Sequence, residues 1–502
     1  MQRYYSKSNP CGEGVKEDIR NLKKGIVWKT ASTGINALVG FAMSVIFARF
    51  LGKDIYGELI LVYTVVTLFA LICNFGLHSA LQRFIPLYIA QKDEKKFTRF
   101  VLTSVCLGLF FTVLSSLVMF FTAGAVSTHI FRKPWLFPYM RWGALYLFGF
   151  SFLTNIIFSA YHGFQRWRAE CMLNAAYLFL LILAVFITLS VFDKGIIAVL
   201  KVSAAVCLAT ALAGVFHIAG FIKLSKIPLK IEEFASQAKE TLSFSTPLFV
   251  NGLIFYTMMW FDKILLGRYR PLEEVTQYYV AFALGTGILM FIKVSETVFT
   301  PYLAKFTGES FEVLKSKFET IFRLLLHLPI TLSIFLYFFI GPFIRFVYGP
   351  DFGIAVTALK IYLALIILRS SMTPVGLFLV NVYGKTLEAT KIGLISALIH
   401  LVLYFVLIPR YGYIGALAAS IISYIVIWFY IAFFVKCINR LIPRRSALYA
   451  AAGMISVTGI TFIAGHFHFY NRLILSVALA GAYLLFVFLK GDIDIRKIRN
   501  AV

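Results

Sequence analysis

Apolar stretches, each long enough to cross a lipid bilayer, alternate with short polar segments from Gly25 to Lys490. A transmembrane helix needs about 20 mostly apolar residues, because lipid offers backbone N–H and C=O groups no hydrogen-bond partner. The pattern therefore predicts fourteen transmembrane helices. Their ranges are 25–48, 56–82, 100–124, 138–161, 169–192, 196–222, 241–262, 275–303, 324–348, 355–384, 387–408, 412–435, 446–465 and 473–489.

The composition is typical of an all-α integral membrane protein. The chain is 60% hydrophobic and 14% charged, whereas soluble domains carry about 25% charged residues. No loop is long enough to fold as a separate soluble domain, and the polar first 24 residues give no cleavable signal peptide. Most of the six cysteines lie inside predicted helices without close-spaced partners, which favours packing roles over disulfides.

The formal net charge of +25 is distributed in a way that sets topology. Most Lys and Arg residues fall on the side of the membrane that holds the N-terminus, as in the clusters at 92–96 and 440–445. Cytoplasmic enrichment of these residues orients membrane proteins with short loops, and such clusters also contact anionic lipid head groups. We expect a multi-pass protein of the cytoplasmic (inner) membrane with both termini cytoplasmic, and no nucleic-acid partner.

The chain also shows an internal repeat. Gly52 follows the first predicted helix and Gly267 follows the seventh, and each is 34 residues before a proline, Pro86 and Pro301 respectively. Six helices per repeat give two lobes of the same orientation that face each other across a cleft. The predicted organisation is a cytoplasmic segment 1–24, an N-lobe 25–223, a linker 224–240, a C-lobe 241–435, two appended helices at 446–490 and a cytoplasmic tail 491–502.

Two basic residues lie deep inside predicted helices. Arg369 is near the middle of 355–384, and Lys293 is well inside 275–303 with Glu296 one turn away. A lone charge at the bilayer centre costs about 2.5–3.5 kcal/mol on insertion scales, so such residues face a wet cavity or a partner. We predict that Arg369 and Lys293 line a cationic cavity for an anionic substrate, with a Lys293–Glu296 ion pair as the alternative for Lys293.

Other residues complete the predicted site. Lys29 on the first predicted helix and Arg49 directly after it are assigned to the same cationic cavity, although Lys29 is close enough to a helix end to reach the interface instead. Asp262 and Glu296 are candidates for binding a coupling cation, H⁺ or Na⁺, and the neighbouring Lys263 could neutralise Asp262.

Pro247 and Pro374 remove backbone donors inside helices and are the predicted hinges. No enzyme motif and no resident metal or cofactor site is predicted, since the pair His466 and His468 provides two ligands without a third.

Three motifs resemble those of the polysaccharide-export, or O-antigen, flippases of the multidrug/oligosaccharidyl-lipid/polysaccharide (MOP) transporter superfamily. The motifs are 48–52 with 56–57 (ARFLG…YG), 348–352 (YGPDF) and 407–416 (LIPRYGYIGA). The resemblance implies a V-shaped, MATE-like arrangement of two six-helix lobes with two extra C-terminal helices.

The resemblance also implies a function. A flippase of this type moves a polyprenyl-diphosphate-linked oligosaccharide, the repeat unit of O-antigen or another surface polysaccharide, across the membrane by alternating access. An ion gradient or the membrane potential would drive it. The protein would then take part in lipopolysaccharide and cell-envelope biosynthesis, and its partners would be a polysaccharide polymerase and glycosyltransferases.

Three alternatives remain. A multidrug/cation antiporter of the same fold is the first, and the deep basic residues count against its cationic substrates. A lipid II flippase is the second. The sequence pattern of those proteins has an Arg-Asp pair in the first helix, whereas this chain has Met43-Ser44 at the corresponding positions, which counts against this alternative. A membrane-embedded polysaccharide polymerase or glycosyltransferase is the third and most distant, because every loop is short.

Overall fold

The computed structural model describes residues 13–192, 195–220, 231–303, 306 and 308–441, together with residues 479, 481 and 483. Throughout these residues the regular structure is helical, and no strand occurs in them. The chain divides into two compact units, residues 1–256 and residues 257–502. The division falls inside a helix, after the start of the predicted C-lobe at residue 241.

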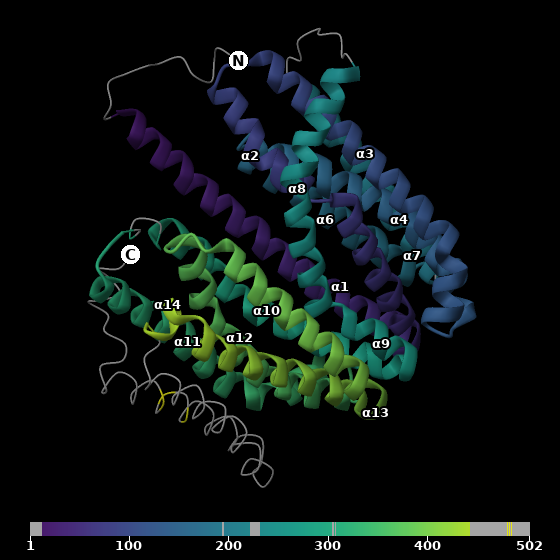
Figure 1. The fold of residues 1–502 in the computed structure, drawn as a ribbon. Coiled ribbons are helices and arrows are strands. Elements are labelled where there is room, and N and C mark those ends of the chain that lie inside the picture. The colour runs from purple at the N-terminus through teal and green to yellow at the C-terminus, as the bar shows by residue number, and fades with distance from the viewer. Residues whose placement is uncertain are drawn as a thin grey trace. The chain divides into compact units, whose positions relative to one another are not determined.

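Unit 1 is a bundle in which α1 packs on α3, α4 and α6, and α4 lies beside α3 and α7 (Figure 1). The helices of this unit are α1 (Glu13–Asn74), α2 (Leu77–Ala90), α3 (Glu94–Ala125), α4 (Phe137–Ser151), α5 (Ser159–Gly163), α6 (Trp167–Ser190), α7 (Ile196–Ala219) and most of α8 (Ile231–Met259). Short helical segments η1 (Val126–Ile130), η2 (Pro134–Leu136) and η3 (Phe152–Phe158) connect some of them.

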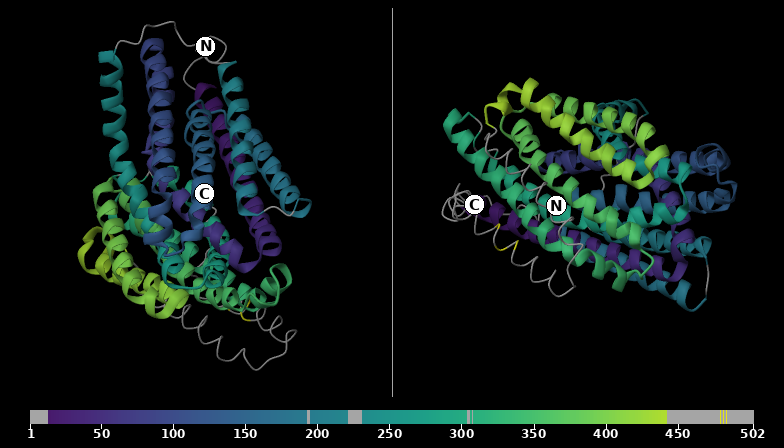
Figure 2. Two further views of the ribbon diagram at one scale, coloured as in Figure 1. Left: turned by 90° about the vertical axis from the view of Figure 1, so that its right-hand side faces the viewer. Right: turned by 90° about the horizontal axis from the view of Figure 1, so that it is seen from below.

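Unit 2 is organised around α12, which packs against α10, α11 and α13 (Figures 1 and 2). Its helices are α9 (Phe261–Tyr269), α10 (Leu272–Leu303), α11 (Phe311–Val347), α12 (Gly353–Asn381), α13 (Thr386–Phe434) and α14 (Lys436–Asn439). Helix α12 is buried along most of its length, including Leu363, Ile366 and Phe378. The central helix of this unit therefore contacts protein on nearly every side.

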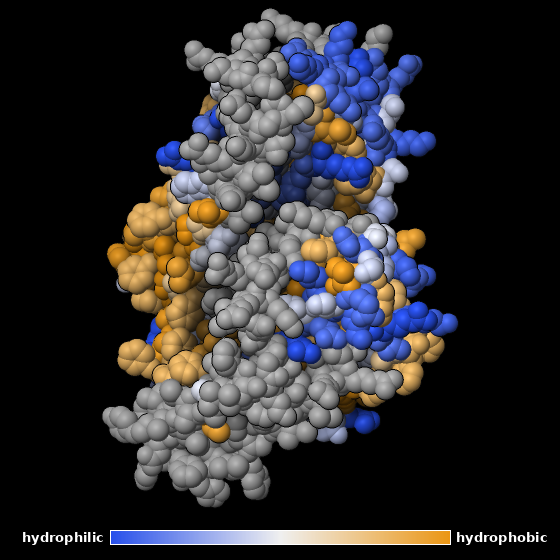
Figure 3. All heavy atoms as spheres, turned by 90° about the vertical axis from the view of Figure 1, so that its left-hand side faces the viewer, coloured by the Kyte–Doolittle hydropathy of each residue, from blue (hydrophilic) through white to orange (hydrophobic). Residues whose placement is uncertain are grey.

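Large apolar side chains are exposed on many helices, and hydrophobic residues cover a broad area of the face drawn in Figure 3. Examples are Phe121, Phe216, Phe346 and Phe433, each more than 70% exposed. A soluble protein rarely exposes such extensive apolar surface, whereas lipid is the natural environment of these side chains. Nine helical segments in the described residues are long and apolar enough to span a bilayer, and the prediction of an all-α membrane protein is confirmed.

The first twelve predicted spans all fall on helical segments. The last two, 446–465 and 473–489, lie outside the described residues apart from the isolated positions, so the count of fourteen stays a prediction. Helix α1 begins at Glu13, before the apolar stretch, because polar residues with good helix propensity extend it. The second predicted helix is interrupted at Phe75 and Gly76, both with positive φ, before α2 continues to Ala90.

Glycines with positive φ form two of the corners between predicted spans. Gly52 (φ 75°, ψ 176°) breaks α1, and Gly412 (φ 56°, ψ −133°) breaks α13. Both backbone conformations are essentially restricted to glycine. The repeat does not preserve this geometry at Gly267, which lies inside α9. There the corner is at Arg270, extended because Pro271 follows.

Candidate functional site

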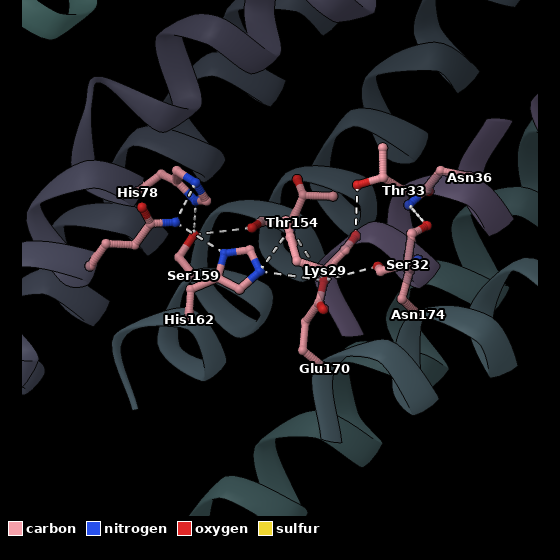
Figure 4. A network of polar contacts seen from close by, with 11 residues as sticks. Lys29, Ser32, Thr33, Asn36, His78, Thr154, Ser159, His162, Glu170 and Asn174 are labelled. Atoms are coloured by element: carbon pink, nitrogen blue, oxygen red, sulfur yellow. Dashed lines mark hydrogen bonds and ion pairs between the residues drawn. The ribbon is translucent and has the colours of Figure 1, made fainter. Parts of the chain in front are cut away.

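A network of polar side chains inside unit 1 contains the predicted site residue Lys29 (Figure 4). The Lys29 Nζ lies 3.0 Å from His162 Nε2 and 3.8 Å from Glu170 Oε1. The His162 Nε2 is also 3.4 Å from the same Glu170 oxygen. An ammonium, an imidazole and a carboxylate from α1, α5 and α6 therefore meet at one point.

Hydrogen bonds extend this network in two directions. Toward α6, Ser32 donates to Glu170 Oε1 at 3.4 Å and accepts from Asn174 at 3.1 Å. Toward α2, the Gln82 amide nitrogen lies 3.0 Å from His162 Nδ1 and 2.8 Å from His78 Nε2. The polar chain therefore runs from α1 and α6 through α5 to α2.

The far end of the chain is at Ser159, which lies 2.6 Å from His78 Nδ1. Its hydroxyl also donates to the Thr154 carbonyl at 3.2 Å. Thr154 belongs to η3, a wider π-helical turn between α4 and α5. Such turns release carbonyls from the regular α-helical ladder and are frequent at functional sites.

Two glycines allow the helices of the network to approach one another. A Cβ on Gly25 would lie 2.8 Å from the Trp167 indole, and a Cβ on Gly163 would lie 2.7 Å from Ile85 and from the Leu81 carbonyl. Gly25 therefore brings α1 onto the start of α6, and Gly163 brings α5 onto α2. The Trp167 ring in turn packs against that of His162 in a tilted arrangement, with ring centroids 5.2 Å apart.

Burial differs sharply among the three charged or titratable groups. The side chains of His162 and Glu170 are 6% and 4% exposed, whereas that of Lys29 is 45% exposed. A buried carboxylate requires compensation by donors or an opposite charge. The Lys29 ammonium supplies the opposite charge, although its side chain remains partly exposed.

A second polar cluster lies in unit 2, around the predicted ion-coupling residue Asp262. Its carboxylate is 3.0 Å from the Lys263 ammonium and accepts a hydrogen bond from the Tyr278 hydroxyl. Lys263 also donates to the Met259 carbonyl at 2.7 Å, and its ammonium is 3.6 Å from the centre of the Phe282 ring. Lys263 is fully buried, so in this structure it neutralises Asp262.

Arg369, the main predicted cavity residue, lies on α12 at the edge of this cluster. Its guanidinium donates to the Met259 sulfur at 3.2 Å and interacts with the Tyr362 hydroxyl. No carboxylate in the described part of the chain forms an ion pair with it. Asp262 and Lys263 cancel each other, so the cluster carries a net charge of +1 through Arg369.

The other predicted residues are distributed more widely. Arg49 is exposed on α1. The backbones of Lys293 and Glu296 are helical, within α10, but their side chains lie outside the described ones. Pro247 and Pro374 lie inside α8 and α12 as predicted, and Pro374 deprives the Ser370 carbonyl of its helical partner. Their role as hinges stays a prediction.

Sequence reasoning missed His162, Glu170, His78 and Gln82. Each falls within about a turn or two of a predicted helix end, on the side that the charge pattern predicts to be cytoplasmic. Their common depth in the membrane is the feature of the sequence that could have identified them. Four polar groups at the same depth are expected to meet where their helices pack. Among the described residues no three His, Cys, Asp or Glu side chains lie close enough to hold a metal ion.

The family model described as "Polysaccharide biosynthesis protein" matches residues 22–307 of the chain. An uncharacterized membrane protein of Methanocaldococcus jannaschii is 23% identical over 514 aligned positions, which cover 95% of this chain and 97% of that protein.

Solved structures show the same fold at low identity. The lipid II flippase MurJ in an inward closed conformation has a TM-score of 0.67 and 17% identity, covering 92% of this chain and 99% of that one. An inward-facing multidrug resistance MATE family transporter of the MOP superfamily has a TM-score of 0.65 and 14% identity, with 81% and 94% covered. A MOP superfamily transporter of Pyrococcus furiosus has a TM-score of 0.58 and 15% identity, with 84% and 96% covered. The predicted MOP-type fold is confirmed.

Proposed function

Because the chain belongs to the polysaccharide biosynthesis protein family, we propose that it is a flippase for a polyprenyl-diphosphate-linked oligosaccharide. Its cargo would be the repeat unit of O-antigen or of another surface polysaccharide, moved across the cytoplasmic membrane by alternating access. Glycosyltransferases that build the lipid-linked unit and a polymerase that consumes it would be its functional partners.

The observation that carries the proposal is the uncompensated charge of Arg369. Its contacts in the described part of the chain are a thioether and a tyrosine hydroxyl, and neither cancels a positive charge. A guanidinium presents a planar fork of N–H donors that matches phosphate oxygens bidentately. A diphosphate is therefore a suitable ligand for this position, whereas a cationic drug is not.

Unit 1 supports the same cargo with a second cation. The Lys29 ammonium is half exposed beside its buried carboxylate partner, and an ammonium binds phosphate as a point charge. The sugar-diphosphate head would bind such cationic groups during its crossing, while the polyprenyl tail stays in lipid. We keep an ion gradient or the membrane potential as the driving force.

The test uses protein reconstituted in vesicles with a fluorescent polyprenyl-diphosphate oligosaccharide, whose arrival in the opposite leaflet is measured. We expect Arg369→Ala and Lys293→Ala each to reduce transport at least tenfold, a loss of about 1.4 kcal/mol in transition-state stabilisation, with normal membrane insertion. Arg369→Lys is the matched control, which keeps the charge and loses the fork. Full activity of the Arg369→Ala/Lys293→Ala double variant would overturn the cationic-cavity mechanism.

The alternatives give different results in the same vesicles. A drug antiporter of this fold would export cationic dyes, and Arg369→Ala would leave that export unchanged. A lipid II flippase would move lipid II in preference to other diphosphate-linked sugars. In cells, deletion of the gene should leave the lipid-linked repeat unit on the cytoplasmic leaflet and abolish the surface polymer.

A further inference from the structure

His162 lies between two hydrogen-bond donors. On one side the Lys29 Nζ is 3.0 Å from Nε2, and on the other the Gln82 amide nitrogen is 3.0 Å from Nδ1. An ammonium has donors only, and a neutral imidazole has one acceptor nitrogen and one N–H. His162 therefore cannot accept hydrogen bonds from both neighbours at once. Two arrangements compete at its Nε2: in the first, Nε2 accepts a hydrogen bond from Lys29, and in the second, Nε2 carries a proton of its own.

The second arrangement already has an acceptor in place. Glu170 Oε1 is 3.4 Å from the same Nε2, so a proton on Nε2 would find a carboxylate to bind. The other oxygen of that buried carboxylate, Oε2, has no hydrogen-bond partner among the described residues. An unpartnered oxygen of a buried carboxylate is costly, and a nearby imidazolium offsets that cost electrostatically.

We infer that His162 is a proton-binding site at which a proton and Lys29 compete for Nε2. When His162 is neutral, Lys29 donates to Nε2 and is held inside the network. When a proton from water binds the Nε2 lone pair, the Lys29 hydrogen bond is lost and the new N–H turns to Glu170. The step forms one N–H bond, breaks no covalent bond of the protein and releases the ammonium of Lys29.

Proton binding also changes the charge that unit 1 presents. With neutral histidines, Lys29 and Glu170 cancel each other, and one added proton makes the network +1. The released charge is on the half-exposed Lys29 rather than on the buried His162. The site therefore converts proton binding into an ammonium free to bind an anionic group, which links a proton to the diphosphate head of the cargo.

The groups that face His162 limit the site to one proton. Lys29 on α1 and Glu170 on α6 contact it directly, and His78 on α2 is reached through Gln82, with its ring centroid 5.6 Å away. Two imidazolium rings at this separation repel each other. Gln82 also hydrogen-bonds to both rings, so we infer that the pair holds one added proton at a time.

Trp167 provides a readout of this proton without any substrate. Its ring lies 5.2 Å from that of His162, and an imidazolium at this distance quenches indole fluorescence more strongly than a neutral imidazole does. Fluorescence of the purified full-length protein is titrated between pH 5 and 8, where histidine changes charge. The signal of a Trp167→Phe variant is subtracted to isolate Trp167.

Four variants give opposed results. We expect a single quenching step on acidification, absent in His162→Gln and unchanged in His217→Gln, a histidine of α7 bonded to Tyr161. Lys29→Met removes the competing cation, so the step should move to higher pH. Glu170→Gln removes the stabilising carboxylate, so the step should move to lower pH, each shift being about one unit or more.

A step that persists in His162→Gln, or shifts of the same sign in Lys29→Met and Glu170→Gln, would overturn the inference. The last two variants keep the test decisive if His162→Gln does not fold. The role in transport rests on the proposed flippase function, whereas the fluorescence test does not. A fluorescence step without oligosaccharide transport would reject the flippase function and retain the proton site at His162. Transport without the fluorescence step would retain the flippase function and reject the proton site.

Discussion

The two units each hold a lysine–carboxylate pair, and the two pairs differ in almost every respect. Asp262 and Lys263 are adjacent in sequence, 3.0 Å apart, and 4% and 0% exposed. Lys29 and Glu170 come from different helices, are 3.8 Å apart, and only Glu170 is buried. Lys263 is enclosed by a carbonyl and an aromatic ring, whereas Lys29 shares its partner with a histidine.

This difference separates a fixed pair from an exchangeable one. The donors of Lys263 and the oxygens of Asp262 are directed at specific partners, so any change of charge leaves a buried group uncompensated. In the Lys29 network a histidine and a carboxylate oxygen that has no partner among the described residues leave room for another proton. We therefore expect the pair of unit 2 to contribute to stability and that of unit 1 to function.

The largest expected effect is the loss of stability on breaking the buried pair. Lys263→Met leaves the Asp262 carboxylate buried without its cation, which typically costs about 3–5 kcal/mol. The free energy of unfolding, measured by circular dichroism during denaturant titration in detergent, checks this value. The Asp262→Asn/Lys263→Met double variant is the control, because it removes both charges and should recover much of the loss. A Lys263→Met variant as stable as the parent protein would contradict a fixed pair.

Substitution of the two corner glycines, one in each unit, should cause an intermediate loss of stability. Gly52→Ala should lose about 1–3 kcal/mol from backbone strain alone, because nothing lies within 4 Å of the added Cβ. Gly412→Ala should lose more, because its Cβ would clash with Glu274 Oε1. That carboxylate accepts from the Tyr413 N–H at 2.7 Å and pairs with Arg270, so the clash also disturbs the start of the following helical segment. The same denaturant titration ranks the two variants, and equal losses would show that Glu274 moves aside freely.

The smallest expected effect on stability is that of Lys29→Met. A half-exposed ion pair contributes no more than about 1 kcal/mol. Without Lys29, a proton on His162 would compensate the buried Glu170 carboxylate, which lies 3.4 Å from His162 Nε2, so unfolding should change little. Transport of the fluorescent lipid-linked oligosaccharide should nevertheless fall at least tenfold, equivalent to about 1.4 kcal/mol. A loss of stability like that of Lys263→Met would place both pairs in the same structural role and remove the contrast.

The helices were predictable from the sequence because the requirement imposed by lipid is local. Twenty apolar residues satisfy it wherever they occur, and the first twelve predicted spans are helical. The corners at Gly52 and Gly412 were also marked, since both glycines belong to the motifs that carry the family resemblance. Arg369 was recognised from its depth alone, and the structure adds that its contacts with the described residues include no carboxylate.

The partners of Lys29 were not predictable in this way. His162 is 133 positions away along the chain, and nothing in the periodicity of either helix specifies that their ends meet. The contact depends on close approach at Gly25 and Gly163 and on the π-helical turn of η3, which are properties of packing. Asp262 and Lys263 were a predictable pair for the opposite reason, because adjacent residues need no tertiary structure to meet.

That adjacency has a consequence for how the chain enters the membrane. An isolated charge within a membrane helix costs about 2.5–3.5 kcal/mol during insertion, and Asp262 meets Lys263 as soon as both leave the ribosome. Lys29 must wait for His162, 133 residues later, or roughly 7 to 27 seconds at ordinary rates of synthesis. Throughout that interval the first helix holds its ammonium with head groups or water, so the polar network of unit 1 assembles late in biogenesis and the buried pair of unit 2 assembles at once.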